Sequence, residues 1–171
     1  AQNAMLHPLE SVLYYVHGYY GSTDSWNPLD SELYERGVLL NYDHVERFDY
    51  AEYWLDAYPD CDIDDVHAQC TISSFAWRLA VDIENANYDP GTQIDIVAHS
   101  LGGIIARELL RVYRSELQND HNIDFGRIIT LGTPHEGTYL ADGSIPSSLL
   151  VFLISVFNWG QNWDSPLLDY L

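Results

Sequence analysis

The sequence predicts an α/β protein in which a mostly parallel sheet carries helices on both faces. Residues 11–16 form an apolar run without alternation, which is typical of a strand buried on both faces. Residues 94–98 form a second such run. Between the strand-like runs lie segments of about a dozen residues whose apolar positions keep helical spacing. Strands that alternate with helices favour right-handed βαβ units and therefore a parallel sheet.

The expected elements follow from the residues that begin and end them. Strands are expected at residues 11–16, 45–50, 94–98 and 128–131. Helices are expected at residues 25–36, 73–88 and 101–115. Ser25 is a suitable cap for the first helix and Gly37 ends it, while the Asp-Pro-Gly sequence at residues 89–91 ends the second. The second helix has four apolar residues on one face: Ala76, Leu79, Ala80 and Ile83. The third has Ile105, Leu109, Val112 and Tyr113.

Length and charge narrow the class of protein. A chain of 171 residues lies in the usual range for one domain, so residues 1–171 are expected to form one. The longest uncharged apolar stretch, residues 149–156, is much shorter than the ~18 residues of a membrane span, so no transmembrane segment is expected. With 26 acidic residues against seven Arg, the net charge of -19 argues against nucleic-acid binding. This charge suits either an archaeal or halophilic-like protein kept in high salt or an ordinary acidic protein.

Cys61 and Cys70 are the only cysteines, nine positions apart in an acidic segment. A small disulfide and two free thiols fit this spacing equally well. Residues 1–10 lack a basic region followed by an apolar run, so no signal peptide is expected there, although a processed start would look the same. A secreted or extracellular location is expected in preference to the cytoplasm.

The strongest functional signal is the sequence Ile-Asp-Ile-Val-Ala-His-Ser-Leu-Gly-Gly at residues 94–103. A buried strand runs directly into a turn of small residues and then into a helix, as a nucleophile elbow requires. Strained backbone at the serine demands small residues two positions before and after it, here Ala98 and Gly102. The turn aims the Ser100 hydroxyl at the helix N-terminus, where N–H groups favour negative charge. Ser100 is therefore the expected nucleophile.

A serine between small residues also occurs by chance, so the surrounding strand, turn and helix carry this interpretation. Ala98 stands where the motif usually begins with glycine, and it adds a single methyl group. His99 precedes the serine directly. On a tight turn this adjacency points its ring away from Ser100, so His99 is expected to pack beside the site and not to act as its base.

Two further segments accompany the elbow. They are His17-Gly18-Tyr19 after the first strand and Leu-Gly-Thr-Pro-His-Glu-Gly-Thr at residues 131–138. Together with residues 98–103, they resemble the lipase families of the α/β-hydrolase superfamily, including small bacterial and archaeal lipases whose elbow also begins with alanine. The segments follow the family's order and cover roughly residues 10–140. The resemblance implies an α/β-hydrolase fold and cleavage of carboxylic esters.

The resemblance also implies roles for single residues. The N–H groups of Tyr19 and Leu101 correspond to the two donors of the oxyanion hole. Two fixed donors would meet the charge that develops on the carbonyl oxygen, and losing one such donor typically costs ~10²–10³ in turnover. His135 corresponds to a residue that shapes the acyl pocket, and it is expected to be structural. His17 and Gly18 would support the pocket, although taken alone they also fit a simple strand-ending turn.

Beyond Gly137 the chain changes character. Residues 144–159 are apolar nearly throughout. Residues 137–160 are expected to form a mobile lid over an acyl-chain pocket, because such a lid is apolar inside when closed and meets lipid when open. An ordinary buried helix at the edge of the domain is the alternative.

The histidine and acid of a catalytic triad are not found in their family positions. Serine hydrolases of this fold have the order serine, acid, histidine, yet no histidine follows His135. The strands expected to carry these two residues are also not recognisable. We therefore expect an α/β-hydrolase domain that lacks its C-terminal strands, with the acid and histidine beyond Leu171.

The expected function is that of a serine ester hydrolase, a lipase or carboxylesterase, acting through an acyl-enzyme at Ser100. An acyltransferase or thioesterase with the same machinery and a catalytically inactive binding module are the alternatives. The substrate would be a lipid or another carboxylic ester, with contact to lipid aggregates. No metal or cofactor is expected, because no cluster of His, Cys or carboxylates has ligand spacing.

Overall fold

The computed structural model describes residues 10–19, 21–50 and 72–137. Cys61 and Cys70 lie outside these residues, and so do residues 138–160 of the expected lid. Within the described ranges, no helix is long and apolar enough to span a bilayer.

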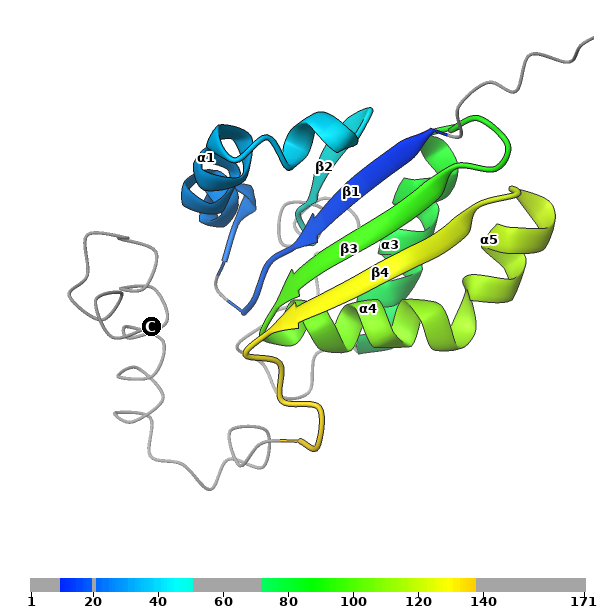
Figure 1. Cartoon of the computed structure of the whole chain (residues 1–171). Coiled ribbons are helices and arrows are strands. Elements are labelled where there is room, and N and C mark those ends of the chain that lie inside the picture. Colours follow the sequence, from blue (N-terminus) through cyan, green and yellow to red (C-terminus); the bar gives the residue numbers. More distant parts are fainter. Residues whose placement is uncertain (1–9, 20, 51–71, 138–171) are drawn as a thin grey trace, which may run out of the picture.

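Four parallel strands form the central sheet, in the spatial order β2-β1-β3-β4 (Figure 1). The strands are β1 (Ser11–Val16), β2 (His44–Phe48), β3 (Gln93–His99) and β4 (Asp124–Leu131). β1 and β3 occupy the centre and are buried almost throughout, as their continuous apolar sequences predict. β4 is an outer strand, and none of the described residues forms a strand on its outer side.

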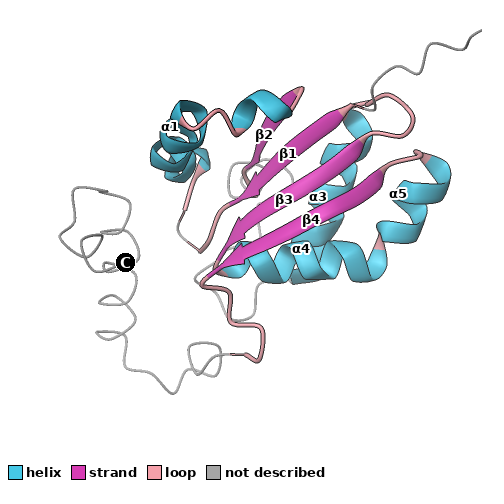
Figure 2. Ribbon diagram, in the orientation of Figure 1, coloured by secondary structure: helices cyan, strands magenta, loops and turns pink. Residues whose placement is uncertain are grey.

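Helices cover both faces of this sheet (Figure 2). They are α1 (Asn27–Glu35), α3 (Ile72–Asn85), α4 (Leu101–Val112) and α5 (Arg114–Asp120), with 3-10 turns at Thr23–Trp26 and Leu39–Asn41. On one face, the larger core cluster contains Leu79 of α3, Ile105 of α4 and Ile96 of β3. On the other, Leu33 of α1 packs against a smaller cluster that contains Tyr15. Neighbouring side chains of a strand point to opposite faces, which explains why β1 contributes to both clusters.

These features confirm the α/β class and the parallel sheet that the sequence predicts. All four expected strands are present, although β4 begins at Asp124, four residues earlier than expected. The helix expected at residues 73–88 is α3, and each of its four predicted core residues is buried: Ala76, Leu79, Ala80 and Ile83.

Two helix predictions need correction. The helix expected at residues 101–115 is interrupted at Tyr113, and its continuation, α5, places Leu117 in the core. The prediction that Val112 lies on the buried face is wrong, because its side chain is 43% exposed. Ser25 does not cap α1, since it lies inside the preceding 3-10 turn, where its hydroxyl accepts a hydrogen bond from the Ser22 N–H.

A buried carboxylate joins β3 to β4. Asp95 is 5% exposed and accepts hydrogen bonds from the Arg127 backbone N–H at 2.6 Å and from the Tyr42 hydroxyl at 2.7 Å. The Arg127 guanidinium lies 2.7 Å from the same carboxylate. Burial disfavours the charged carboxylate, but these hydrogen bonds and the guanidinium together hold the pKa of Asp95 below its usual value. The register between β3 and β4 shifts at this point, so Asp95 has a structural role.

Replacing Asp95 by alanine should destabilise the protein by about 1–3 kcal/mol, because the Arg127 N–H and the Tyr42 hydroxyl lose their acceptor. The sign of the pH dependence follows from the lowered pKa. A carboxylate with a depressed folded-state pKa stabilises the fold above its unfolded pKa of about 4, and this stabilisation disappears as the pH falls through the folded value. Denaturant unfolding at a series of pH values should therefore show the two proteins converging below about pH 4. A gap that persists in strong acid would contradict this assignment.

Candidate active site at the carboxyl end of the sheet

Ser100 occupies a strained turn between β3 and α4. Its backbone angles are φ 51° and ψ -119°. The two other non-glycine residues with positive φ in the described ranges are Asn87 and Asn122, a residue type that tolerates left-handed backbone. A serine gains no such relief, and its ψ lies outside the left-handed helical region. Strain of this kind costs about 1–3 kcal/mol and is concentrated at functional sites.

Close packing holds this turn in place. The Ser100 N–H donates to the Leu131 carbonyl at 2.8 Å, which joins the turn to the end of β4. A Cβ atom at Gly102 would lie 2.3 Å from the Val16 carbonyl oxygen and 2.5 Å from the His17 carbonyl oxygen. No side chain fits there, so the small residue expected two positions after the serine is a steric requirement. Ala98, two positions before it, is completely buried.

The segment that follows β4 packs against the start of α4. A Cβ atom at Gly103 would lie 2.0 Å from the Thr133 hydroxyl oxygen. The ring of His135 is engaged on both sides: the Arg107 guanidinium donates to Nδ1 at 3.1 Å, and Nε2–H donates to the Thr130 hydroxyl at 2.9 Å. Arg107 also donates to the His135 carbonyl at 3.0 Å. These contacts tie His135 to α4 through Arg107 and to β4 through Thr130. Sequence reasoning expected no role for Thr133, although it lies in the segment at residues 131–138, or for Arg107, which belongs to no recognised motif.

The turn after β1 lies directly beside Ser100. A Cβ atom at Gly18 would come within 3.0 Å of the Ser100 Cβ and within 2.8 Å of His99 Nδ1. The turn closes with a hydrogen bond from the Gly21 N–H to the Gly18 carbonyl at 2.9 Å. The structure thus places the backbone of His17 and Gly18 against the elbow. Leu101 begins α4, so its N–H belongs to the first turn, where N–H groups have no acceptor within the helix.

His17 is buried beneath this turn, 1% exposed. Its Nδ1 lies 2.8 Å from the Gly18 carbonyl oxygen, and its Nε2 lies 3.2 Å from a carboxylate oxygen of Asp49. Both oxygens are acceptors, so the ring donates to one of them in either neutral tautomer and to both when it carries two protons. The ring also stacks on Tyr50, with centroids 4.2 Å apart. Asp49 was missed by the sequence analysis, because it lies inside the strand expected at residues 45–50, whereas β2 ends at Phe48 and leaves Asp49 just after the strand.

His99 packs between the turn after β1 and the turn after β4, close to Gly18 and Gly132. Burial lowers the pKa of His99, and the nearby His17 lowers it further. Both effects favour the neutral ring.

His121 lies at the opposite end of the sheet. It follows α5, and its Nε2 is 3.8 Å from a carboxylate oxygen of Glu84. The seven residues of β3 separate that end from Ser100 by on the order of 20 Å. None of the residues that the structure describes hydrogen bonds to the Ser100 hydroxyl.

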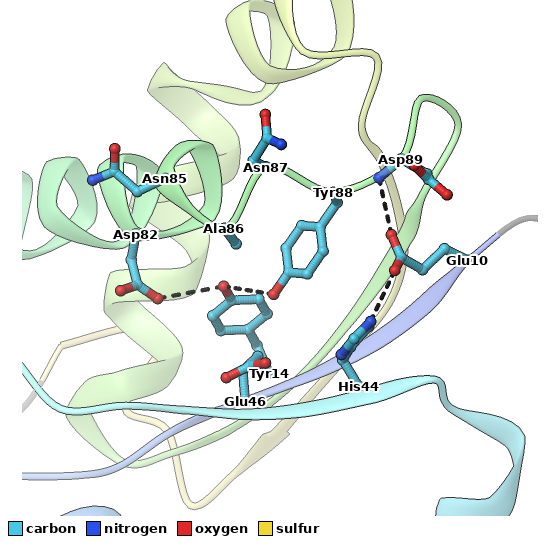
Figure 3. Close-up of a pocket in the computed structure, with 10 residues that line it drawn as sticks. All are labelled: Glu10, Tyr14, His44, Glu46, Asp82, Asn85, Ala86, Asn87, Tyr88 and Asp89. Carbon is cyan, nitrogen blue, oxygen red and sulfur yellow. Dashed lines mark hydrogen bonds and ion pairs between the residues drawn. The ribbon is translucent and has the colours of Figure 1, made fainter.

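A cavity lined by described residues also lies at that far end, beside the end of α3 (Figure 3). Its volume is about 600 Å³. It is lined by Glu10, Tyr14, His44, Glu46, Asp82, Asn85, Ala86, Asn87, Tyr88 and Asp89. Several of these side chains hydrogen bond to one another. The Tyr14 hydroxyl hydrogen bonds to Asp82 and Tyr88, and His44 hydrogen bonds to Glu10 (Figure 3). No group of His, Cys and carboxylates in the described ranges is arranged to hold a metal ion.

The parallel sheet and the strained serine between strand and helix define the class, an α/β protein of the α/β-hydrolase fold type. Within that class, the chain belongs to the family described as Domain of unknown function (DUF7379), whose model matches residues 2–162.

Two crystal structures of one bacterial protein are similar to this chain. They are the Bacillus licheniformis lipase BlEst2 in its mature form and in its propeptide form. Each has 26% sequence identity and a TM-score of 0.49, over 80% of this chain. The similarity covers 46% of the mature chain and 25% of the propeptide form, so this chain spans less than half the length of either. A search of curated proteins found no match.

Proposed function

We propose that this protein is a serine hydrolase that cleaves carboxylic esters, with Ser100 as its nucleophile. The observation that carries the proposal is the strained backbone of Ser100 at the junction of β3 and α4. A fold maintains such strain only where the surrounding contacts enforce it, and here Val16, His17 and Leu131 do so. The nucleophile elbow is the known motif that places a serine in this way.

In the proposed reaction, the Ser100 oxygen attacks the ester carbonyl while a histidine base takes the hydroxyl proton. The carbonyl oxygen gains the negative charge, and the N–H groups of Tyr19 and Leu101 donate hydrogen bonds to it. Collapse of this intermediate expels the alcohol, which receives the proton, and leaves an acyl group on Ser100. Water then releases the acid by the same steps. No described histidine hydrogen bonds to the Ser100 hydroxyl, and we propose that the base comes from outside the described residues.

The choice of substrate extends the same proposal. A lipid or another carboxylic ester would be the substrate, and the protein would meet lipid aggregates in a secreted or extracellular setting. An acyl-enzyme also transfers its acyl group to alcohols or thiols in other proteins of this mechanism, so hydrolysis and transfer must be separated by experiment.

Labelling with a fluorophosphonate tests the proposal directly. A competent nucleophile should react within minutes, and peptide mass spectrometry should place the adduct on Ser100. Heat-denatured protein is the control, because an unfolded serine hydroxyl is a poor nucleophile at neutral pH. The protein should also hydrolyse p-nitrophenyl butyrate before fluorophosphonate treatment and lose this activity after it. Adding an alcohol to the assay should show whether transfer of the acyl group to the alcohol competes with hydrolysis. A native protein that neither reacts nor hydrolyses would indicate a binding module instead.

A further inference from the structure

The direction of the Tyr19 N–H is determined by the carbonyl of the residue before it. Gly18 O and Tyr19 N–H belong to one planar peptide group, and the described chain contains no cis peptide bond. In a trans peptide the C=O and N–H point in opposite directions. Any contact that fixes the Gly18 carbonyl therefore also aims the Tyr19 N–H.

Two groups meet the Gly18 carbonyl. The Gly21 N–H donates to it at 2.9 Å, which closes the turn. His17 Nδ1 lies 2.8 Å from the same oxygen. The Cα of Gly18 is at the same time pressed against Ser100 and His99, as the absence of space for a Cβ atom shows. Rotation of this peptide group is thus opposed from both sides.

His17 is itself held in place by residues at the end of β2. The carboxylate of Asp49 lies 3.2 Å from its Nε2, and the Asp49 side chain is only 14% exposed. Tyr50, 2% exposed, stacks on the ring at 4.2 Å. With a proton on each ring nitrogen, the imidazole donates Nε2–H to Asp49 and Nδ1–H to the Gly18 carbonyl at the same time, while stacking on Tyr50 fixes the plane of the ring.

We propose that Asp49 is a positioning residue for the oxyanion hole, acting through His17 and the Gly18 carbonyl to aim the Tyr19 N–H. This inference rests on the proposed function, since it assigns Tyr19 the role of oxyanion donor. Asp49 does not touch the substrate. Its effect is on the geometry of a donor that matters most in the transition state, when the charge on the carbonyl oxygen is greatest.

Steady-state kinetics of Asp49→Ala and Asp49→Asn on a small soluble ester test the catalytic part. Loss of an oxyanion donor costs ~10²–10³ in kcat, so a misaimed donor should cost at least ~10-fold in Asp49→Ala. KM should stay within about 2-fold, because the interaction is made in the transition state. Asn can still bond to Nε2, so Asp49→Asn should keep a larger share of kcat than Asp49→Ala. The matched control is His44→Ala, which removes the His44–Glu10 pair at the far end of the same two strands. It should leave kcat unchanged.

Amide hydrogen exchange provides a readout that does not depend on catalysis. The Gly21 N–H donates to the Gly18 carbonyl, so its exchange should become at least ~10-fold faster in Asp49→Ala and stay unchanged in His44→Ala. Unchanged protection of Gly21, or an equal loss of protection throughout the molecule, would overturn the positioning role. If the unmodified protein hydrolyses no ester and Ser100 does not react, the proposed function fails. The exchange rate of the Gly21 N–H then still shows whether Asp49 holds the Gly18 carbonyl in place. If the protein is active and Asp49→Ala keeps its full kcat, only the positioning role fails.

Discussion

Replacing Ser100 by alanine is expected to lower kcat for ester hydrolysis on the order of 10⁴-fold or more, because no other described group at this position can form the acyl-enzyme. The fold should be unaffected. Ser100 contributes no side-chain cap to α4, and alanine experiences the same backbone strain as serine at φ 51°. Thermal unfolding of the variant should therefore match that of the parent protein, while its ester hydrolysis falls to background.

Ser100→Gly is the matched variant that separates chemistry from strain. Glycine adopts this backbone conformation without penalty, so Ser100→Gly should be as inactive as Ser100→Ala and yet more stable, by about 1 kcal/mol. Hydrolysis retained by either variant would remove Ser100 from the mechanism. An unchanged or lower melting temperature for Ser100→Gly would show that the turn is not strained.

A side chain at Gly102 should have the largest effect on stability. The Cβ atom of Gly102→Ala would lie 2.3 Å from the Val16 carbonyl oxygen, a backbone atom of the central strand β1 that cannot move without disturbing the sheet. Overpacking usually costs about 1–3 kcal/mol, and a backbone obstacle places this variant at or above the upper end of that range. Denaturant unfolding should show the loss, and phosphonate labelling of Ser100 should decline with it because the serine moves with the helix.

Gly37→Ala serves as the control for that experiment. Gly37 has φ +71°, but a Cβ atom there meets only a Leu40 methyl group at 3.8 Å. The variant measures the cost of backbone strain without a clash, about 1 kcal/mol, and should leave Ser100 fully reactive. Equal losses of stability in Gly102→Ala and Gly37→Ala would mean that α4 and β1 can move apart at little cost.

Local patterns in the sequence were sufficient to predict the strands, turn and helix around Ser100. The unbroken apolar runs of β1 and β3 predict buried parallel strands, and the small residues after β3 predict the turn, because each depends on its own neighbours in the chain. The break at Tyr113 could not be predicted in this way. The helical spacing continues through residue 113, whereas in the structure the helix breaks there and the next helix buries Leu117 in the core.

Contacts between distant residues account for the other omissions. Asp95 looks like an interruption of an apolar strand, and only the fold shows that Tyr42 and Arg127 surround its carboxylate. His17 and Asp49 directly follow the neighbouring strands β1 and β2 but are far apart in the sequence, so their contact depends on the parallel pairing of these strands. The Asp95 contacts and the Asp49–His17 contact both depend on strand order and register, which are tertiary properties.

The contact between Gly102 and β1 has a consequence for the order in which the molecule folds. The carbonyls of Val16 and His17 pack against the start of α4 and hold the Ser100 turn in place. They reach this position only when β1 pairs with β3. That pairing closes a loop of about 80 residues, at an entropic cost near 4 kcal/mol, whereas α4 can begin to form within its own segment. A reactive serine therefore cannot exist in a chain that has only its helices. The proposed nucleophile would become competent together with the sheet, late in folding, so a partly folded chain carries the sequence of the site without its chemistry.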